Sequence, residues 1–306
     1  MTATLLAVQA LNGLQLGLLL FLIAAGLSLV FGVMDFLNLA HGVQYMLGAY
    51  LAVTCAAWAG SFWAGVALAV PLAGIIALVL EFLVFRQLYR RSHLDQVLAT
   101  FGIILTMNEA VRWFWGAAPL RADMPDLLSG SFEIMPGLRY PIYRVALIAT
   151  GLGVAAVLAW VIGRTRAGMW IRAGATHPDI VAALGVNIDR VFLGVIGVGA
   201  MLAGFAGALA APLVSVEPGM GDNLLILAFV VIVIGGTGSI RGAFAGALLV
   251  GLVDTIGRAL TTEILKIALG ASGAARVGPA LASMLIYLVM AAVLAVRPAG
   301  LFTARA

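Results

Sequence analysis

The 306-residue sequence contains few charged residues: Asp, Glu, Lys and Arg make up 10% of the chain, whereas 63% of its residues are hydrophobic. Soluble domains are about 45–50% apolar and about 25% charged. The chain therefore lacks the polar residues that a water-exposed surface would need, and its mean hydropathy of +1.14 agrees. This composition excludes a soluble globular fold and predicts that almost the whole chain lies in a membrane.

Cysteine and lysine are nearly absent. Cys55 is the only cysteine and lies in an apolar run, which excludes an intramolecular disulfide and a cysteine-based metal site. Lys266 is the only lysine, so arginine carries most of the positive charge. Nucleic-acid binding would need a basic stripe with aromatic residues, and the sequence has none. The N-terminus also lacks the basic segment of a cleavable signal peptide. We therefore expect its first apolar run to be retained as a transmembrane helix.

Long apolar runs follow one another along the chain. Because a transmembrane helix needs about 20 predominantly apolar residues, the runs predict an all-α polytopic membrane protein with about 8–10 helices in a single domain, 1–306. The runs at 224–235 and 243–257 are too short to span a bilayer alone, so some segments are expected to be interrupted or re-entrant. The nine predicted spans are 12–34, 43–59, 63–85, 97–115, 142–163, 191–212, 224–235, 243–257 and 279–296.

The distribution of arginine predicts the orientation, because cytoplasmic loops of membrane proteins are enriched in Arg and Lys. The loop at 86–91, the segment 164–190 and the C-terminal tail are rich in arginine and fall on one side of the nine spans. The loop at 116–141 and the turn at 215–223 carry acidic residues and fall on the other side. We expect a multi-pass membrane protein with its N-terminus outside and its C-terminus in the cytoplasm.

Two polar, glycine-containing stretches, 31–42 and 235–242, interrupt the apolar pattern at membrane depth. Irregular backbone in a bilayer is tolerated only where protein or a water-filled cavity satisfies its polar groups, and paired interrupted helices indicate a transport pathway. Whether the two stretches mark an internal repeat of two halves stays open. The candidate pathway residues are Asn38, His41, Gly42, Gln44, Gly235, Gly236, Gly238 and Gly242, with Asn12, Gln15 and Asn108 as further polar residues within spans.

Ionisable residues within the spans do not form a catalytic or metal-binding set. His41, His93 and His177 lie far apart in the sequence, so neither a metal site nor a catalytic site is predicted. We expect His41 and Asn38 to satisfy backbone groups at the first interruption. Glu81 lies near the end of a span, and we expect it to form an ion pair with Arg86 rather than to relay protons.

The segment 164–190 is the largest predicted cytoplasmic loop. Thr176 or His177 can cap a short helix, Pro178 suits its first turn, and Asp179 complements the positive helix N-terminus. Gly185 then provides a helix stop. From these residues alone, an ordinary linker between two spans is the favoured interpretation over a specialised loop.

This segment carries a family resemblance. Arg172-Ala173, followed by Ala182 and 185–187, resembles the coupling loop of permeases in ATP-binding-cassette importers, which docks onto the ATP-binding subunit in that family. Four further stretches, 31–50, 81–90, 98–103 and 228–242, are similar to LivH-type branched-chain amino-acid permeases, although Gln87 stands where that family often has proline. The resemblance assigns the coupling role to Arg172, Ala173, Thr176, Pro178, Asp179, Ala182 and Gly185.

The resemblance implies a non-enzymatic permease subunit of the bacterial inner membrane, which passes branched-chain or related amino acids to the cytoplasm by alternating access. It implies three kinds of partner: a second, LivM-like permease, two cytoplasmic ATP-binding subunits that hold ATP and magnesium, and a periplasmic binding protein. No cofactor would be bound by this chain. A permease for urea or short-chain amides is an open alternative.

Two alternatives come from other classes of protein. An ion-coupled secondary transporter would need coupling carboxylates, for which Asp254 and Glu109 are available near span ends. A membrane-embedded enzyme would need a clustered nucleophile, base or metal set, which the sequence does not offer.

Overall fold

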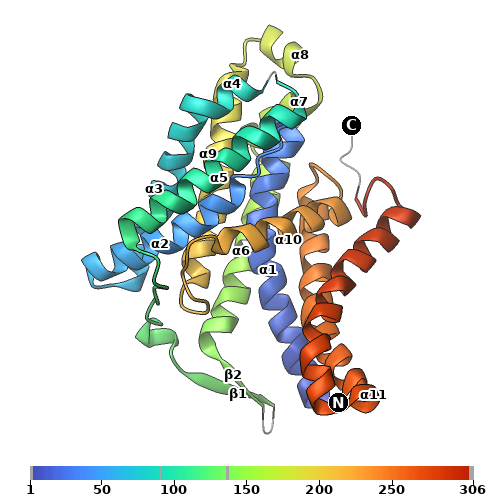
Figure 1. Ribbon diagram of the computed structural model, residues 1–306. Coiled ribbons are helices and arrows are strands. Elements are labelled where there is room, and N and C mark those ends of the chain that lie inside the picture. Colours follow the sequence, from blue (N-terminus) through green and yellow to red (C-terminus); the bar gives the residue numbers. More distant parts are fainter. Residues whose placement is uncertain (1–2, 90, 136–137, 303–306) are drawn as a thin grey trace.

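A computed structural model describes residues 3–89, 91–135 and 138–302, and these form a bundle of long helices with one small hairpin (Figure 1). Each of the nine predicted spans overlaps a helix, which confirms the all-α membrane fold. The elements are α1 (Ala3–Met34), α2 (His41–Ala59), α3 (Phe62–Leu80), a π-helical turn (Glu81–Phe85), α4 (Arg86–Leu88), α5 (His93–Trp115), a 3-10 turn (Asp126–Leu128), β1 (Ser131–Met135), β2 (Leu138–Pro141), α6 (Ile142–Arg164), α7 (Arg166–Thr176), α8 (Pro178–Ala183), α9 (Ile188–Ala210), α10 (Met220–Gly235) and α11 (Ile240–Val296).

Six helices among the described residues are long and apolar enough to cross a membrane: α1, α3 with its extension to Leu88, α5, α6, α9 and α11. Helix α11 contains two of the predicted spans in its 57 residues and turns back at Gly270, whose φ is +71°. The prediction that the span at 243–257 is too short is therefore wrong, because the helix continues beyond it to this turn. Helix α10, with 16 residues, is short as predicted.

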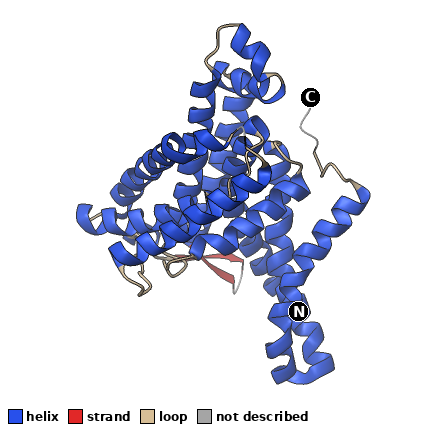
Figure 2. Ribbon diagram, turned by 45° about the horizontal axis from the view of Figure 1, so that its top comes forward, coloured by secondary structure: helices blue, strands red, loops and turns tan. Residues whose placement is uncertain are grey.

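The connecting segments gather at two ends of the bundle (Figure 1). Helices α4, α7 and α8 lie at the upper end of that view, whereas the N-terminus, the hairpin and the turn of α11 lie at the lower end. The hairpin pairs β1 with β2 in antiparallel register, with Phe132 opposite Tyr140, and is the small strand pair in Figure 2. Two of the three arginine-rich segments predicted to share one side, those of α4 and of α7 and α8, thus lie at the upper end, whereas Arg305 of the C-terminal tail lies outside the described residues.

Helix α1 lies at the centre of the bundle and packs against α6, α9, α10 and α11. Small residues allow these close approaches. A Cβ added to Gly48 of α2 would overlap the backbone of Gly204 on α9, and one added to Gly207 would overlap the Tyr45 carbonyl. A Cβ added to Gly251 of α11 would likewise overlap the Gly13 carbonyl of α1.

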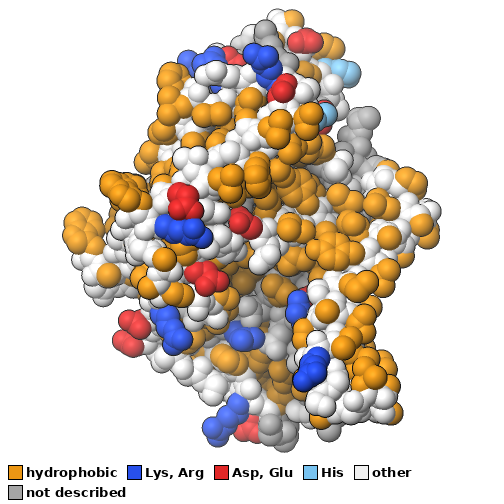
Figure 3. All heavy atoms as spheres, in the orientation of Figure 1, with side chains coloured by type: hydrophobic (Ala, Val, Ile, Leu, Met, Phe, Trp, Pro, Cys, Tyr) orange, Lys and Arg blue, Asp and Glu red, His pale blue; other side chains and the backbone are white. Residues whose placement is uncertain are grey.

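The surface is mostly apolar, as a lipid-facing protein requires. Hydrophobic side chains cover the centre and right of the face in Figure 3, whereas charged side chains gather at its upper end and along its lower left. Trp58 and Ile267 are 85% and 90% exposed. Apolar exposure of this extent in a soluble protein would mark a large binding surface, but here it accords with the composition of a membrane protein.

Candidate transport pathway and coupling segment

The first helix interruption separates α1 from α2. Asp35 ends the helical geometry with a left-handed φ of +49°, which non-glycine residues rarely adopt. Buried His41 donates from Nε2 to the Ile23 carbonyl of α1 at 3.1 Å, so it satisfies a backbone group, although one within α1 rather than at the break. The buried side-chain oxygens of Asn38 and Gln44 have no hydrogen-bond partner among the described residues. Such unpaired buried acceptors are rare because each costs about 1–3 kcal/mol.

The second interruption separates α10 from α11 and is built on glycine. Gly236 and Gly238 have φ values of +104° and +75°, a region in which a side chain is strained. Ser239 then caps α11, because its Oγ accepts a hydrogen bond from the Gly242 amide at 3.1 Å. The Gly-Gly-Thr-Gly-Ser sequence thus reverses the chain and restarts a helix within a few residues.

The segment after α11 completes the end of α10. The amides of Leu301 and Phe302 donate to the carbonyls of Ile234 and Gly235 at 2.8 and 2.9 Å. The last carbonyls of a helix have no partner within the helix itself. The tail therefore satisfies polar groups that the second interruption would otherwise leave unpaired.

The two interruptions lie against each other. A Cβ added to Gly32, near the end of α1, would overlap the Gly238 Cα. A Cβ added to Gly42, in the first turn of α2, would similarly overlap the Gly221 carbonyl at the start of α10. The structure thus joins the two interruptions at Gly32 and Gly238, whereas Gly42 lies against the opposite end of α10. The role of the candidate pathway residues in conduction stays a prediction.

Gln96 of α5 joins the first interruption to the loop that follows α4. It is 2% exposed, and its Oε1 accepts a hydrogen bond from the Leu37 amide at 3.1 Å. Its Nε2 donates to the carbonyls of Leu88 and Arg91, both at 3.3 Å. One side chain therefore satisfies three backbone groups of two separate irregular segments, as non-helical backbone in a membrane protein requires.

Aromatic side chains extend from this interruption to α9. The ring of Phe36 lies 5.4 Å from that of Phe85 and 5.5 Å from that of Tyr89, and Tyr89 also contacts Phe192 of α9 at 5.9 Å. The Tyr89 hydroxyl donates to Glu81 Oε1 at 2.8 Å. Burial and this hydrogen bond raise the pKa of Tyr89, which keeps the hydroxyl protonated as a donor.

The predicted ion pair between Glu81 and Arg86 is wrong. Glu81 is buried and bonded to Tyr89, whereas the Arg86 side chain is 54% exposed and pairs with Asp189 in the first turn of α9, at 3.1 Å. The Glu81 side chain therefore lies in the protein interior, whereas the Arg86 side chain lies at the surface. The π-helical turn at Glu81–Phe85 occupies the part of the helix between these two positions.

Helices α7 and α8 form the predicted coupling segment and lie at the upper end (Figure 1). Pro178 begins α8, and Gly185 follows it with a φ of +87°, so the predicted first turn and stop are confirmed. The predicted cap is wrong: His177 occupies the cap position without a side-chain hydrogen bond, and the Thr176 hydroxyl donates back to α7 carbonyls. The hydroxyl of Thr176 reaches the preceding turn and is not available for capping.

Part of the exposed surface of α8 and its C-terminal cap is apolar. Ile180 in α8 and Leu184 at the cap are 57% and 79% exposed, whereas the Val181 side chain is buried. Helix α9 begins directly afterwards, capped by Asn187, whose Oδ1 accepts from the Arg190 amide at 3.1 Å. Of the candidate coupling residues, Ala173 is half-buried and the others are exposed: Arg172, Thr176, Pro178, Asp179, Ala182 and Gly185.

The three additional polar candidates lie apart from the interruptions. Asn12 and Gln15 line a pocket toward the lower end of α1. Asn108 donates from Nδ2 to Asp222 at 3.4 Å, beside the start of α10. The structure therefore does not bring all polar residues of the spans into one path.

Comparison with known proteins identifies the family. The model of the family described as branched-chain amino acid transport system / permease component matches residues 9–294. The chain belongs to this permease family. It is 29% identical to the high-affinity branched-chain amino acid transport system permease protein BraD of Pseudomonas aeruginosa. The 263 aligned residues make up 81% of this chain and 85% of the relative. No solved structure matches the chain.

Two further relatives carry related names. The high-affinity branched-chain amino acid transport system permease protein LivH of Escherichia coli strain K12 is 28% identical over 271 residues, or 83% of this permease and 87% of the relative. The probable branched-chain amino acid transport permease protein LivH of Methanocaldococcus jannaschii is 25% identical over 250 residues, or 78% and 76%. The match to LivH-type permeases that the sequence motifs predict is therefore confirmed.

Sequence reasoning missed two residues that organise this permease. Gln96 lies one residue before the predicted span at 97–115, and its polar side chain at the edge of an apolar run was the available signal. Tyr89 lies in a loop and carried no signal, because its partners Glu81, Phe36 and Phe192 come from three separate segments.

Proposed function

We propose that this permease is a membrane subunit of an ATP-binding-cassette importer for branched-chain or related amino acids. The observation that carries the proposal is the family match over residues 9–294. The names of the relatives support the substrate class, since each is a branched-chain amino acid transport permease. Conduction would be non-enzymatic, with ATP and magnesium bound by partner subunits.

In this proposal the upper end faces the cytoplasm and the lower end faces outward, across the inner membrane. Arg86, Arg164 and Arg172 belong to segments at the upper end, and positive charge is retained on the cytoplasmic side. The N-terminus then lies outside. A periplasmic binding protein would deliver the substrate to the lower end, and a second, LivM-like permease would complete the pathway.

Helix α8 would dock onto the ATP-binding subunit through the exposed Ile180 and Leu184. Its movement would pass to α9, whose first residues contact the neighbouring elements through Asp189 and Phe192. From there the contacts lead through Tyr89 to Phe36 in the first interruption. Binding of ATP by the partner would thus favour one arrangement of the interruptions over another, which is the requirement for alternating access.

The carboxylates that an ion-coupled transporter would use are already paired. Asp254 accepts from Arg258 at 2.7 Å, and Glu109 accepts from Arg112 at 2.7 Å. An ion pair of this kind neutralises a carboxylate that would otherwise bind the coupling ion. The pairing supports energy from ATP rather than from an ion gradient.

The test measures assembly and uptake together. We expect Ala182→Arg to reduce co-purification of the ATP-binding subunits, identified by mass spectrometry, and to reduce ATP-dependent uptake of labelled leucine, because a long charged side chain would enter the docking surface. The matched control is Ala118→Arg, which makes the same change at an exposed position in the loop after α5. Unchanged co-purification and uptake in Ala182→Arg would contradict the docking assignment.

The source of energy is tested separately. Uptake that persists without ATP-binding subunits and stops when an uncoupler is added would contradict the proposal and support a secondary transporter.

A further inference from the structure

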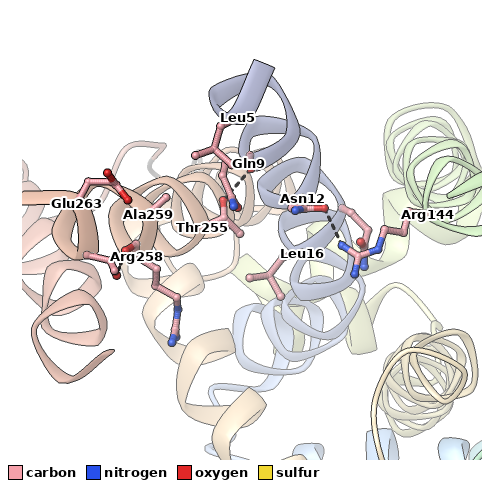
Figure 4. A pocket seen from close by; sticks show the side chains of 11 residues that line it. Leu5, Gln9, Asn12, Leu16, Arg144, Thr255, Arg258, Ala259 and Glu263 are labelled. Carbon is pink, nitrogen blue, oxygen red and sulfur yellow. Dashed lines mark hydrogen bonds between the residues drawn. The ribbon is translucent and has the colours of Figure 1, made fainter. Parts of the chain in front are cut away.

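A pocket of about 570 Å³ lies toward the lower end, between α1, the start of α6 and the middle of α11 (Figure 4). The leucines Leu5 and Leu16 contribute apolar lining. Its polar lining comes from all three helices and includes Asn12, Gln15, Arg144, Thr255, Arg258 and Glu263.

Arg144 is held in place by neutral groups. Its Nη1 donates to Asn12 Oδ1 at 2.6 Å, the bond drawn in Figure 4, and the Tyr140 hydroxyl donates to the same oxygen at 3.1 Å. Burial raises the pKa of Tyr140, so this hydroxyl stays a donor. The amide oxygen of Asn12 therefore fixes the guanidinium without neutralising its charge.

The position of Arg144 in the first turn of α6 is electrostatically unfavourable. The N-terminus of a helix carries a partial positive charge, which disfavours a cation and favours an anion. The other charged residues of the pocket are balanced differently: Arg258 pairs with Asp254 at 2.7 Å, and Glu263 pairs with Lys266 at 2.7 Å. The half-buried Arg144 is thus the cation of this pocket whose bonded partner is an uncharged amide.

We infer that this pocket binds an anionic oxygen group, a carboxylate or a phosphate, on the guanidinium of Arg144. A guanidinium donates several parallel N–H groups and matches both anions. Gln15, which is 7% exposed and lines the same pocket, adds an amide that can complete the contact. The source of the anion is either the carboxylate of an amino acid entering from outside or the phosphate of an anionic lipid. The first source rests on the proposed function, whereas the second does not.

The experiment uses the purified full-length chain in nanodiscs of phosphatidylcholine, without partner subunits. Two probes are measured, labelled L-leucine by equilibrium binding and phosphatidylglycerol by native mass spectrometry. Arg144→Gln removes the cation, and loss of one charge-assisted hydrogen bond should weaken the bound probe about tenfold or more. Arg121→Gln is the control, because it removes an exposed arginine from the loop after α5.

A second variant separates binding from a structural role. Asn12→Asp places a carboxylate where the amide oxygen now accepts from Arg144, so it neutralises the guanidinium while keeping α1 bonded to α6. We expect the same loss of probe binding with an unchanged or higher melting temperature.

The outcomes are distinct. If Arg144→Gln and Asn12→Asp both lose leucine binding, the pocket is assigned to the substrate carboxylate. If both variants instead lose phosphatidylglycerol binding, the pocket is assigned to the lipid phosphate. If neither probe binds the wild-type chain, or if Asn12→Asp binds the probe with unchanged affinity, the inference is overturned. Because these assays need no ATP-binding subunit, their failure is separate from failure of the importer proposal.

Discussion

Replacing Gln96 with leucine should loosen the first interruption without changing the bundle. Leucine keeps much of the side-chain volume but removes the acceptor for the Leu37 amide and the donor to the Leu88 and Arg91 carbonyls. Each neutral hydrogen bond contributes about 0.5–1.5 kcal/mol net, so loss of the three should cost about 1.5–4.5 kcal/mol. A cost of about 2 kcal/mol on local opening corresponds to about 30-fold faster amide exchange.

The assay is hydrogen exchange by mass spectrometry on peptides that contain Leu37. Gln87→Leu is the matched control, because Gln87 is exposed and its Nε2 bonds only to the Leu83 carbonyl of its own helical region, at 2.8 Å. The control should leave exchange at Leu37 unchanged. If Gln96→Leu and Gln87→Leu give the same exchange there, the reasoning that Gln96 holds the interruption is refuted.

Two further predictions concern packing and surface charge. Gly48→Ala should lower the melting temperature of the purified chain, since its Cβ would overlap Gly204 and overpacking costs about 1–3 kcal/mol. Gly102→Ala should not, since its Cβ would meet open space, and equal effects would contradict the packing argument. Arg86 and Asp189 are 54% and 71% exposed at their side chains. A double-mutant cycle of Arg86→Gln with Asp189→Asn should therefore give a coupling below about 1 kcal/mol, and a much larger coupling would show that solvent does not screen the pair.

The helices could be predicted because each apolar run is long and is visible in the sequence itself. The continuation of α11 beyond residue 257 was missed for a specific reason: the predicted spans end at 257 and resume at 279, which leaves the charged Arg258 and Lys266 outside them. In the structure they pair along the helix with Asp254 and Glu263, one turn away, so the helix accommodates their charge. The hairpin at 131–141 was also missed, because its strands are short and depend on pairing with each other.

The candidate site was predictable only in part. Polar residues and glycines within apolar runs indicated both interruptions, and Pro178 and Gly185 indicated the bounds of α8. The contacts between these segments were not predictable. The Gln96 hydrogen bonds and the Phe36–Tyr89–Phe192 contacts join residues far apart in the chain, and a single sequence carries no record of which segments meet.

The contact between Gly32 and Gly238 has a consequence for how the family could be studied by comparing sequences. A side chain at Gly32 would overlap the Gly238 backbone, and one at Gly238 would be strained by its φ of +75°. Neither position can compensate for a larger residue at the other, because neither has a side chain to shorten. The two positions should therefore show no correlated substitutions, and contact inference from covariation would overlook the place where the two interruptions meet.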